Sequence, residues 1–342
     1  MPDRAQLHKN LAVLALLAVL PVRAVFAQTS GAQGPPSTPE EELTKTVGFI
    51  SVPCDKNKSV TCNKETGGTG YVTGTCFFVE VPDERLGKGQ SFVYTVTNRH
   101  VATAEGVDPK SLLPEVFLRV NRASPENGSA LAQGAVMLNG PVHWYFPSDD
   151  TVDLAVLPGT VKGAFDIKGI PVSFFATTDR MKSERIAVGD SVFFIGLFLQ
   201  FPGTTRVDPI YRQGVIAMMP TDPIPMSDGI DQKSTKLEHL YLADAHAFHG
   251  NSGSPLFVQV SGVRNGSLMM VGGFPYQLLG VVNGFIPERN DIRVTGAATF
   301  ESSNEPNSGI LTFVPAQELK DLLYSPELQK LRDDIVASQR KP

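Results

Sequence analysis

The residues Gly250–Leu256 read GNSGSPL and surround one serine with small side chains. Small residues let the backbone approach a ligand and turn its N–H groups inward, which is what an oxyanion hole needs. A Gly/Ser turn of an ordinary β protein has the same composition, so the segment alone does not establish catalysis. It also differs from the lipase elbow G-x-S-x-G, because Ser254 stands where that pattern has glycine. The segment predicts that Ser252 is a nucleophile if the rest of the chain supplies a base.

Two upstream segments carry the partners that such a serine requires. In the segment 92–101 (FVYTVTNRHV), a strand pattern runs into a polar turn that ends on His100. In the segment 149–157 (DDTVDLAVL), Asp153 begins an apolar strand. A histidine can take and return the serine proton near neutral pH, and an aspartate fixes the imidazole tautomer. Taken singly, the histidine would equally fit a surface loop and the aspartate a strand-end cap.

Short strand patterns make up most of the chain. Runs of β-branched and aromatic residues are separated by Gly, Pro, Asn and Asp, which predicts an all-β sandwich or barrel. The interior shows no long helical periodicity, and this argues against an alternating βαβ fold. The predicted strands are Val47–Val52, Thr75–Val81, Phe92–Thr97, Glu115–Val120, Val152–Leu157, Ser191–Ile195, Gly214–Met218, Leu240–Ala243, Leu268–Val271, Leu278–Val282 and Ile310–Val314.

Two segments depart from the strand pattern. In the tail 316–342, apolar residues recur at three- and four-residue spacing on both sides of Pro326. This spacing predicts two short amphipathic helices that dock on the β core. The segment Met219–Lys236 is rich in proline and polar residues and has little pattern. We expect a mobile surface loop there.

The first residues carry the signature of a secretory signal. Basic residues precede the apolar run Leu11–Val22, which is too short to span a bilayer, and the small residue Ala27 is one that a signal peptidase accepts. We expect a signal peptide at 1–27 and a secreted or periplasmic protein. An uncleaved anchor is the alternative, because Arg23 follows the run. Residues 28–45 are small, polar and proline-rich, which predicts a flexible tether.

The three cysteines fit a chain outside the cytosol. Cys54 and Cys62 flank a lysine-rich loop and predict a local disulfide, which an oxidising compartment permits. Cys76 lies in an apolar strand pattern, so we expect a buried free thiol. No group of histidines and cysteines has metal-ligand spacing, and we expect neither a metal nor a cofactor.

Composition excludes several classes of protein. The chain has 342 residues, 42% of them hydrophobic and 19% charged, which excludes a disordered chain. The net charge of -5 lacks the basic footprint of a nucleic-acid-binding protein. We expect no membrane span after signal cleavage and a protein or peptide substrate as the partner. Nothing in the composition specifies an oligomeric state.

The three chemical segments occur in the order His100, Asp153, Ser252, which is the order of the chymotrypsin arrangement. With these residues the sequence resembles the trypsin-like serine peptidases, especially the bacterial branch that includes the HtrA proteases and glutamyl endopeptidases. The matching segments are Thr97–Val101, Asp153–Leu157 and Gly250–Pro255, with Val188–Val192, Ile195–Gly196 and Leu279–Asn283 as further family-like strands.

The resemblance implies two six-stranded antiparallel β-barrels with the active site in the cleft between them. The N-terminal barrel would comprise residues 46–170 and the C-terminal barrel residues 171–315. The same resemblance implies that Ser252 is the nucleophile, His100 the general base and then acid, and Asp153 the residue that orients the imidazole. The main-chain N–H groups of Gly250 and Ser252 would form the oxyanion hole, and the substrate pocket would include His246, Ala247, Asn283 and Phe285.

Two positions depart from animal trypsins. Asn251 stands where trypsin has the aspartate that pairs with a newly cut N-terminus, so we expect activity without that cleavage. His246 stands where trypsin has the acidic residue that holds Lys or Arg. We therefore expect the pocket to reject basic side chains and to prefer small or medium apolar ones, with an acidic preference as the competing interpretation.

The sequence thus predicts a serine endopeptidase that acts through an acyl-enzyme on Ser252. A non-catalytic binding protein with the same fold is the first alternative. An esterase or lipase is the second, and the missing elbow and the all-β pattern disfavour it.

Overall fold

The computed structural model describes residues 38–54, 70–104, 116–123, 133–137, 142–160, 165–228, 234–260, 262–264, 267–269, 275–288 and 307–339. The predicted signal peptide, the first part of the predicted tether and Cys62 lie outside the described residues. Among the residues described, no helix is long and apolar enough to cross a membrane.

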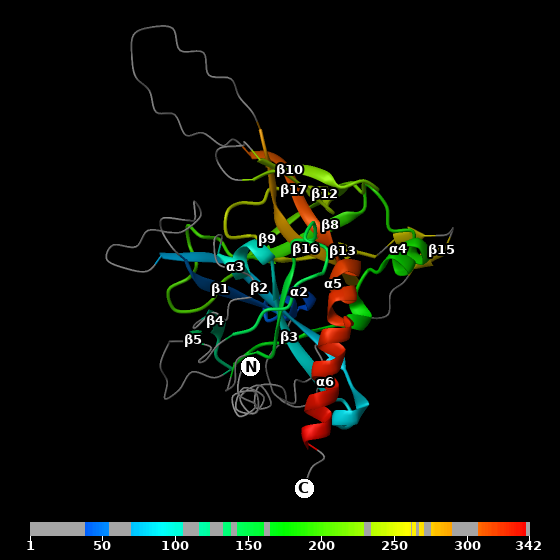
Figure 1. Cartoon of the computed structure of the whole chain (residues 1–342). Helices are drawn as coiled ribbons and strands as arrows, with labels where there is room; N and C mark the ends of the chain where they lie inside the picture. The colour runs from blue at the N-terminus through cyan, green and yellow to red at the C-terminus, as the bar shows by residue number, and fades with distance from the viewer. Residues whose placement is uncertain are drawn as a thin grey trace, which may run out of the picture.

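The N-terminal part of the chain forms a seven-stranded sheet with β2 near its middle (Figure 1). The strands follow the order β5-β4-β1-β2-β3-β6, all antiparallel, and β7 pairs in parallel with β2. The bounds are β1 Val47–Cys54, β2 Gly70–Pro82, β3 Ser91–Thr97, β4 Phe117–Asn121, β5 Gln133–Met137, β6 Ala155–Pro158 and β7 Ile170–Pro171.

The C-terminal part forms a closed barrel in the order β12-β17-β16-β13-β8-β9. Its strands are β8 Ser191–Gly196, β9 Ile210–Met218, β12 Tyr241–Asp244, β13 Pro255–Gln259, β16 Tyr276–Pro287 and β17 Asn307–Pro315. A closed six-stranded barrel, a second β-sheet and short C-terminal helices confirm the predicted all-β fold class and are consistent with a trypsin-like fold. The N-terminal part differs from the six-stranded antiparallel barrel that the resemblance implies: it is a seven-stranded sheet, because the short strand β7 adds a parallel pairing to β2.

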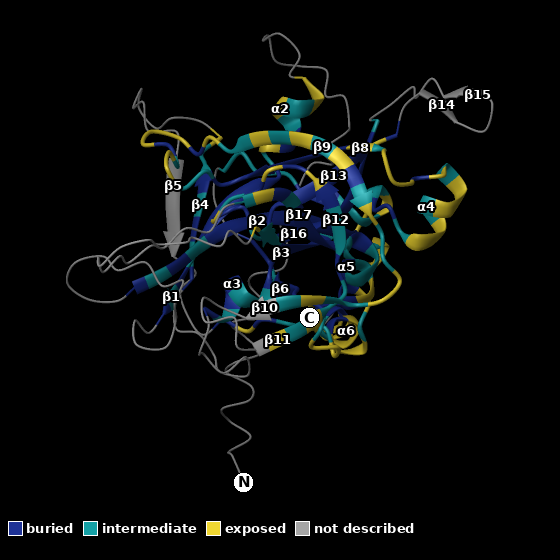
Figure 2. Cartoon of the chain, turned by 90° about the horizontal axis from the view of Figure 1, so that it is seen from above, coloured by how far each residue is buried: buried dark blue, intermediate teal, exposed yellow. Residues whose placement is uncertain are grey.

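Strand β2 shows why an uninterrupted apolar pattern forms a strand here. Successive side chains of a strand point to opposite faces of its sheet. Phe77 and Val79 pack into the same core as Phe193 of the barrel. Cys76 and Phe78 face the other way, into a separate core of the N-terminal sheet. Both faces of β2 are therefore buried, and Figure 2 shows the buried residues gathered in the strands of the two sheets. The buried free thiol expected at Cys76 is confirmed.

The prediction of a patternless loop at Met219–Lys236 was wrong. The segment forms an antiparallel hairpin of β10, Ile224–Asp228, and β11, Ser234–Glu238, with Ile224 opposite Glu238. Proline cannot donate to a ladder and is confined to edges, so the prolines in this segment hid the strand pattern. A second hairpin, β14 Gly262–Arg264 with β15 Ser267–Met269, replaces the strand predicted at Leu268–Val271.

The last part of the predicted tether is also ordered structure. Residues Pro39–Thr44 form helix α2, and Thr38 caps it through a reciprocal bond with Glu41. Leu43 is only 1% exposed, and the hydroxyl of Tyr276 donates to Glu40 at 2.6 Å. The helix is therefore anchored to the body of the protein.

Two helices at the C-terminus confirm the spacing argument. Helix α5 spans Ala316–Leu323 and helix α6 spans Pro326–Gln339. The buried apolar residues of the two helices include Leu319, Leu322, Leu323, Leu328 and Ile335. The other helices in the described part of the chain are η1 Glu84–Leu86, α3 Arg99–Thr103, η3 Val172–Phe174 and α4 Thr178–Glu184.

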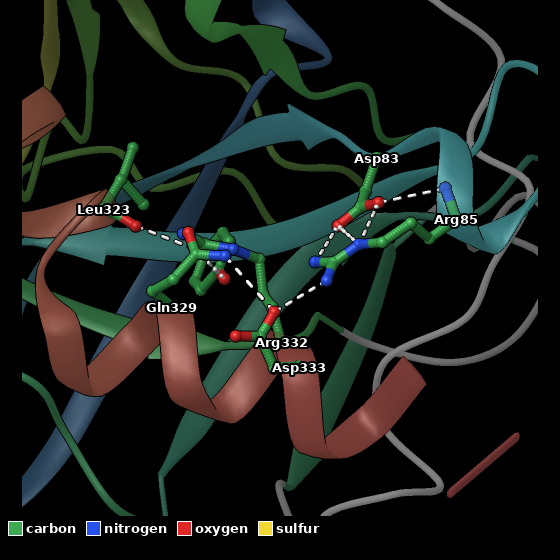
Figure 3. Close-up of polar contacts among 7 residues, drawn as sticks. Asp83, Arg85, Leu323, Gln329, Arg332 and Asp333 are labelled. Carbon is green, nitrogen blue, oxygen red and sulfur yellow. Dashed lines mark hydrogen bonds and ion pairs between the residues drawn. The ribbon is translucent and has the colours of Figure 1, made fainter. Parts of the chain in front are cut away.

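A buried arginine joins helix α6 to the N-terminal sheet. Arg332 is 2% exposed and donates to the Tyr94 hydroxyl on β3 at 2.8 Å and to the main-chain oxygen of Leu323 at 2.7 Å. Figure 3 shows two adjoining ion pairs, in which Arg85 binds both Asp83 and the helix residue Asp333. These bonds hold the chain end across the sheet whose strands lead to the candidate site.

Candidate active site

The end of strand β3 presents His100 to Asp153. Asn98 precedes helix α3, and His100 lies in the only full turn of that short helix. The two Asp153 carboxylate oxygens bind the same residue: Oδ2 lies 2.6 Å from Nδ1 of His100, and Oδ1 accepts from its main-chain N–H at 3.0 Å. The Asn98 amide also donates to the main-chain oxygen of Asp153 at 2.9 Å. The imidazole is therefore fixed in one orientation relative to the carboxylate.

The electrostatics keep this carboxylate ionised. Burial by itself raises the pKa of Asp153, but the charge of His100, its two hydrogen bonds and the charge of Lys236 together lower that pKa below its usual value. A carboxylate at Nδ1 holds the tautomer in which Nε2 faces away from Asp153 and can accept a proton. The sequence also allowed Asp153 to be a strand-end cap; in the structure its carboxylate binds His100.

The turn that carries Ser252 is built around glycine. Gly250 and Gly253 have φ angles of +94° and +85°, a region that favours glycine. A Cβ atom on Gly253 would lie 2.0 Å from the main-chain oxygen of Thr75 and 2.4 Å from Oγ1 of Thr97. A side chain at position 253 would therefore push the turn away from the N-terminal sheet.

Thr75 on β2 fastens the serine turn to that sheet. Its main-chain N–H donates to the oxygen of Ser252 at 2.9 Å, and its hydroxyl donates to the oxygen of Gly250 at 2.8 Å. A Cβ atom on Gly74 would lie 3.1 Å from the side chain of Val101 and 3.2 Å from the oxygen of Ser252. Val101, the residue after His100, and the main-chain oxygen of Ser252 therefore both pack against Gly74. Sequence reasoning missed Thr75, which carries no motif of its own.

The main-chain donors around the serine fall into two groups. The N–H groups of Asn251, Gly253 and Ser254 donate to the oxygens of other residues at 2.9–3.0 Å. Within the described part of the chain, the N–H groups of Gly250 and Ser252 have no such main-chain acceptor. Two donors on one turn, beside a serine, are what the stabilisation of a developing oxyanion requires.

Asn251 holds the turn through its amide. The residue is 1% exposed; its Nδ2 donates to the oxygen of Leu197 at 2.6 Å, and its Oδ1 accepts from the N–H of Phe248 at 2.7 Å. A neutral amide therefore braces the turn from within, without a charge that would need an ionic partner.

The Ser252 hydroxyl donates to the main-chain oxygen of Asn283 on β16 at 2.9 Å. Asn283 is 9% exposed, and its own amide donates to Oε2 of Glu238 at 2.9 Å. Lys236 lies 3.7 Å from the other oxygen of Glu238. Burial and the charge of Asp153 raise the pKa of Glu238. Sequence reasoning missed the pair Lys236 and Glu238, because Lys236 ends the segment predicted as a loop and Glu238, two residues later, belongs to no motif.

The structure places the four predicted pocket residues in different surroundings. Asn283 contacts the serine, and Ala247 is buried. His246 is exposed, and its ring lies 3.2 Å from the position of a Cβ on Gly309. The ring of Phe285 packs edge-on against His249, with 5.5 Å between the ring centroids. Contacts to the serine are therefore shown for Asn283 but not for His246 or Phe285 among the residues described.

The described residues contain no group of three or more His, Cys, Asp or Glu side chains that could hold a metal ion.

No family model matches the sequence, and no curated protein matches it. Among solved structures, the chain is similar to the MamO protease domain from Magnetospirillum magneticum, with 17% identity over 82% of this chain and 97% of that chain at a TM-score of 0.41. It is similar to the active form of the Rv3671c protease from M. tuberculosis, with 17% identity over 87% of this chain and 93% of that chain at a TM-score of 0.40.

A third similar structure is the thermostable serine protease AL20 from an extremophilic microorganism, with 10% identity over 82% of this chain and 96% of that chain at a TM-score of 0.39. At these low TM-scores the likenesses carry no weight for function, which depends on the geometry of the site.

Proposed function

We propose that the protein is a serine endopeptidase. The observation that supports the proposal is the pair of hydrogen bonds that joins His100 to Asp153. Val101, the residue after His100, and the main-chain oxygen of Ser252 both lie beside Gly74. A buried aspartate that binds both the ring and the backbone of one histidine serves to orient that histidine, and an oriented imidazole beside a serine is the arrangement that activates a hydroxyl.

The residues of the site account for each step of the reaction. The Ser252 hydroxyl leaves the oxygen of Asn283 and turns toward His100, which accepts its proton at Nε2. The Ser252 oxygen then bonds to the substrate carbonyl carbon, and the negative charge that develops on the carbonyl oxygen meets the N–H groups of Gly250 and Ser252. The C–N bond of the peptide then breaks as the imidazolium gives its proton to the leaving amine, which leaves the acyl-enzyme. Water, which gives a proton to His100, attacks the acyl carbon, and the bond to the Ser252 oxygen breaks as that oxygen takes the proton back.

The substrate class that we propose is a protein or peptide without Lys or Arg at the cleaved position. His246 stands where an acidic residue would hold such a side chain, and a buried ammonium without a partner is strongly disfavoured. Small or medium apolar residues are the preferred class, and acidic residues are the competing one. Efficient cleavage after Arg in a peptide library would contradict both, while efficient cleavage after Glu would contradict the apolar preference.

We propose that the mature protein is secreted or periplasmic. The basic residues, apolar run and small residue within 1–27 support this localisation. N-terminal sequencing of protein from the extracellular or periplasmic fraction of the producing cells tests it: a start near Gln28 is expected, and a retained residue 1 would indicate an anchor.

Hydrolysis of a peptide library by the wild-type protein and by Ser252→Ala tests the enzymatic function. The expected loss of turnover is on the order of 10⁴ to 10⁶, because the nucleophile is removed. The turn should keep its shape, since its hydrogen bonds are mostly main-chain bonds. A wild-type protein that cleaves nothing in the library but binds peptides would favour the non-catalytic alternative.

A further inference from the structure

The hairpin β10–β11 reaches the active site through Glu238, the last residue of β11. Its Oε2 accepts from the side-chain amide of Asn283 at 2.9 Å, and its Oε1 lies 3.7 Å from the ammonium of Lys236. The Glu238 side chain is only 13% exposed. A carboxylate that is removed from water and paired on both oxygens is held in place, which makes it a firm support for the group that it binds.

Asn283 is a residue whose orientation needs such a support. The register of β16 against β17 shifts at this point: Val282 lies opposite Phe313, and Gly284 lies opposite Thr312. Asn283 is therefore the extra residue of a β-bulge, which the ladder leaves unpaired and re-aims. Because the ladder does not fix Asn283, the side-chain bond to Glu238 supplies the constraint.

The bulge contacts the nucleophile directly. The main-chain oxygen of Asn283 accepts from the Ser252 hydroxyl at 2.9 Å. The adjacent residue Val282 also accepts from the N–H of Gly253 and donates to the oxygen of Ser254, each at 2.9 Å. Any movement of the bulge therefore changes the position of the Ser252 hydroxyl before it attacks the substrate.

Three ionisable groups act electrostatically on Glu238: Asp153 just before β6, His100 on α3, and Lys236 on the same strand as Glu238. Burial and the charge of Asp153 raise the pKa of Glu238, whereas Lys236, the bond to Asn283 and His100 lower it. The carboxylate is thus close enough to the histidine–aspartate pair for their charges to act on one another.

We propose that Glu238 is a positioning residue for the catalytic serine: by holding the amide of Asn283, it fixes the bulge oxygen on which the Ser252 hydroxyl rests. The inference builds on the proposed peptidase function. Loss of the support lets the bulge, and with it the hydroxyl, occupy several positions, of which only some lead to attack. Misplacement by about 1 Å costs up to about 10²-fold in rate.

Two variants at position 238 distinguish loss of the hydrogen bond to Asn283 from loss of the negative charge alone. Glu238→Leu removes the acceptor, whereas Glu238→Gln keeps an oxygen that can accept from Asn283. We expect kcat of the leucine variant to fall about 10- to 100-fold, with KM within about threefold of the wild type. We expect the glutamine variant to keep kcat within about threefold, because the hydrogen bond is retained. Asp244→Leu, at an exposed carboxylate on β12, is the matched control and should change neither constant.

A second change addresses the same bond from its other side and guards against a leucine variant that folds poorly. Asn283→Ala removes the donor and should lower kcat as much as Glu238→Leu does. The double variant should show no further loss, because both substitutions remove one interaction. A leucine variant with wild-type kcat, a glutamine variant as impaired as leucine, or fully additive losses would each overturn the inference.

The outcome is distinguishable from a failure of the proposed function. If the wild-type protein hydrolyses peptides and Ser252→Ala does not, the function stands, and unchanged kinetics in the Glu238 and Asn283 variants then overturn the positioning role alone. If Ser252→Ala is as active as the wild type, the function itself fails.

Discussion

The carboxyl group of Glu80 should make the stability of the protein depend on pH near neutrality. Glu80 lies on β2 and is 3% exposed, and its Oε1 has no hydrogen-bond partner among the described residues. Burial raises the pKa of Glu80 to about 7 from its ordinary value of 4.5, opposed only in part by a hydrogen bond from the main chain of Gly169. Between pH 4.5 and about 7, the Glu80 carboxyl is therefore protonated in the folded protein and ionised in the unfolded chain.

The sign and size of the effect follow from proton linkage. A carboxyl whose pKa is raised by folding favours the folded state most below pH 4.5, and this contribution is lost as the pH rises through about 7. Between pH 5 and pH 8 the wild type should lose about 2.5 kcal/mol of unfolding free energy through this group. Glu80→Gln has no ionisable group at this position, so its unfolding free energy should not fall by this amount.

Urea unfolding of wild type and Glu80→Gln at pH 5 and pH 8 measures this difference directly. The stability of the variant relative to the wild type should rise between the two pH values. Glu84→Gln, at an exposed glutamate nearby on η1, is the control and should follow the wild type at both. If the difference in unfolding free energy between Glu80→Gln and the wild type is the same at pH 5 and pH 8, the Glu80 carboxyl does not have a raised pKa in the folded protein.

Three other substitutions probe separate parts of the account. Asp153→Asn should lower turnover by roughly 10⁴ at neutral pH by favouring the wrong imidazole tautomer, while Asp150→Asn, in the exposed turn before it, should change turnover little; the opposite order would mean that the carboxylate was wrongly chosen. Arg332→Met should lower unfolding free energy by about 2 to 4 kcal/mol, because Tyr94 and a helix carbonyl lose a buried donor, and equal stability in urea would contradict that role. Leu43→Ala should lower the unfolding free energy measured in urea by about 2 to 4 kcal/mol, because it opens a cavity under α2, and an unchanged unfolding free energy would contradict the anchoring of that helix.

The sequence predicted those parts of the fold whose pattern is periodic. The buried strands β2, β3 and β8 are apolar and bounded by turn residues, and the leucine spacing around Pro326 belongs to two helices as expected. The hairpin β10–β11 was missed because its prolines break the strand pattern, although its backbone pairs from Ile224 to Asp228. Helix α2 was missed because the prolines and polar residues beside it resemble a linker, and its anchor, Leu43, is a single apolar residue.

The candidate site divides in the same way. His100, Asp153 and Ser252 lie in segments whose residue types and order indicate acyl transfer, so they could be chosen before the geometry was known. Glu238 and Thr75 could not, since each acts through a hydrogen bond to a residue far away in the chain. Such long-range contacts follow from how the hairpin and the sheet pack, and no local pattern encodes them.

Covalent labelling shows directly whether Ser252 is an activated nucleophile. Diisopropyl fluorophosphate reacts when an activated serine oxygen bonds to phosphorus and fluoride leaves, so the adduct marks the nucleophile. Peptide mapping by mass spectrometry should find the adduct on Ser252 in the wild-type protein, and at a rate at least about 10³-fold lower in His100→Ala, where the base is missing. An adduct on another serine, or equal labelling of Ser252 without His100, would contradict the account.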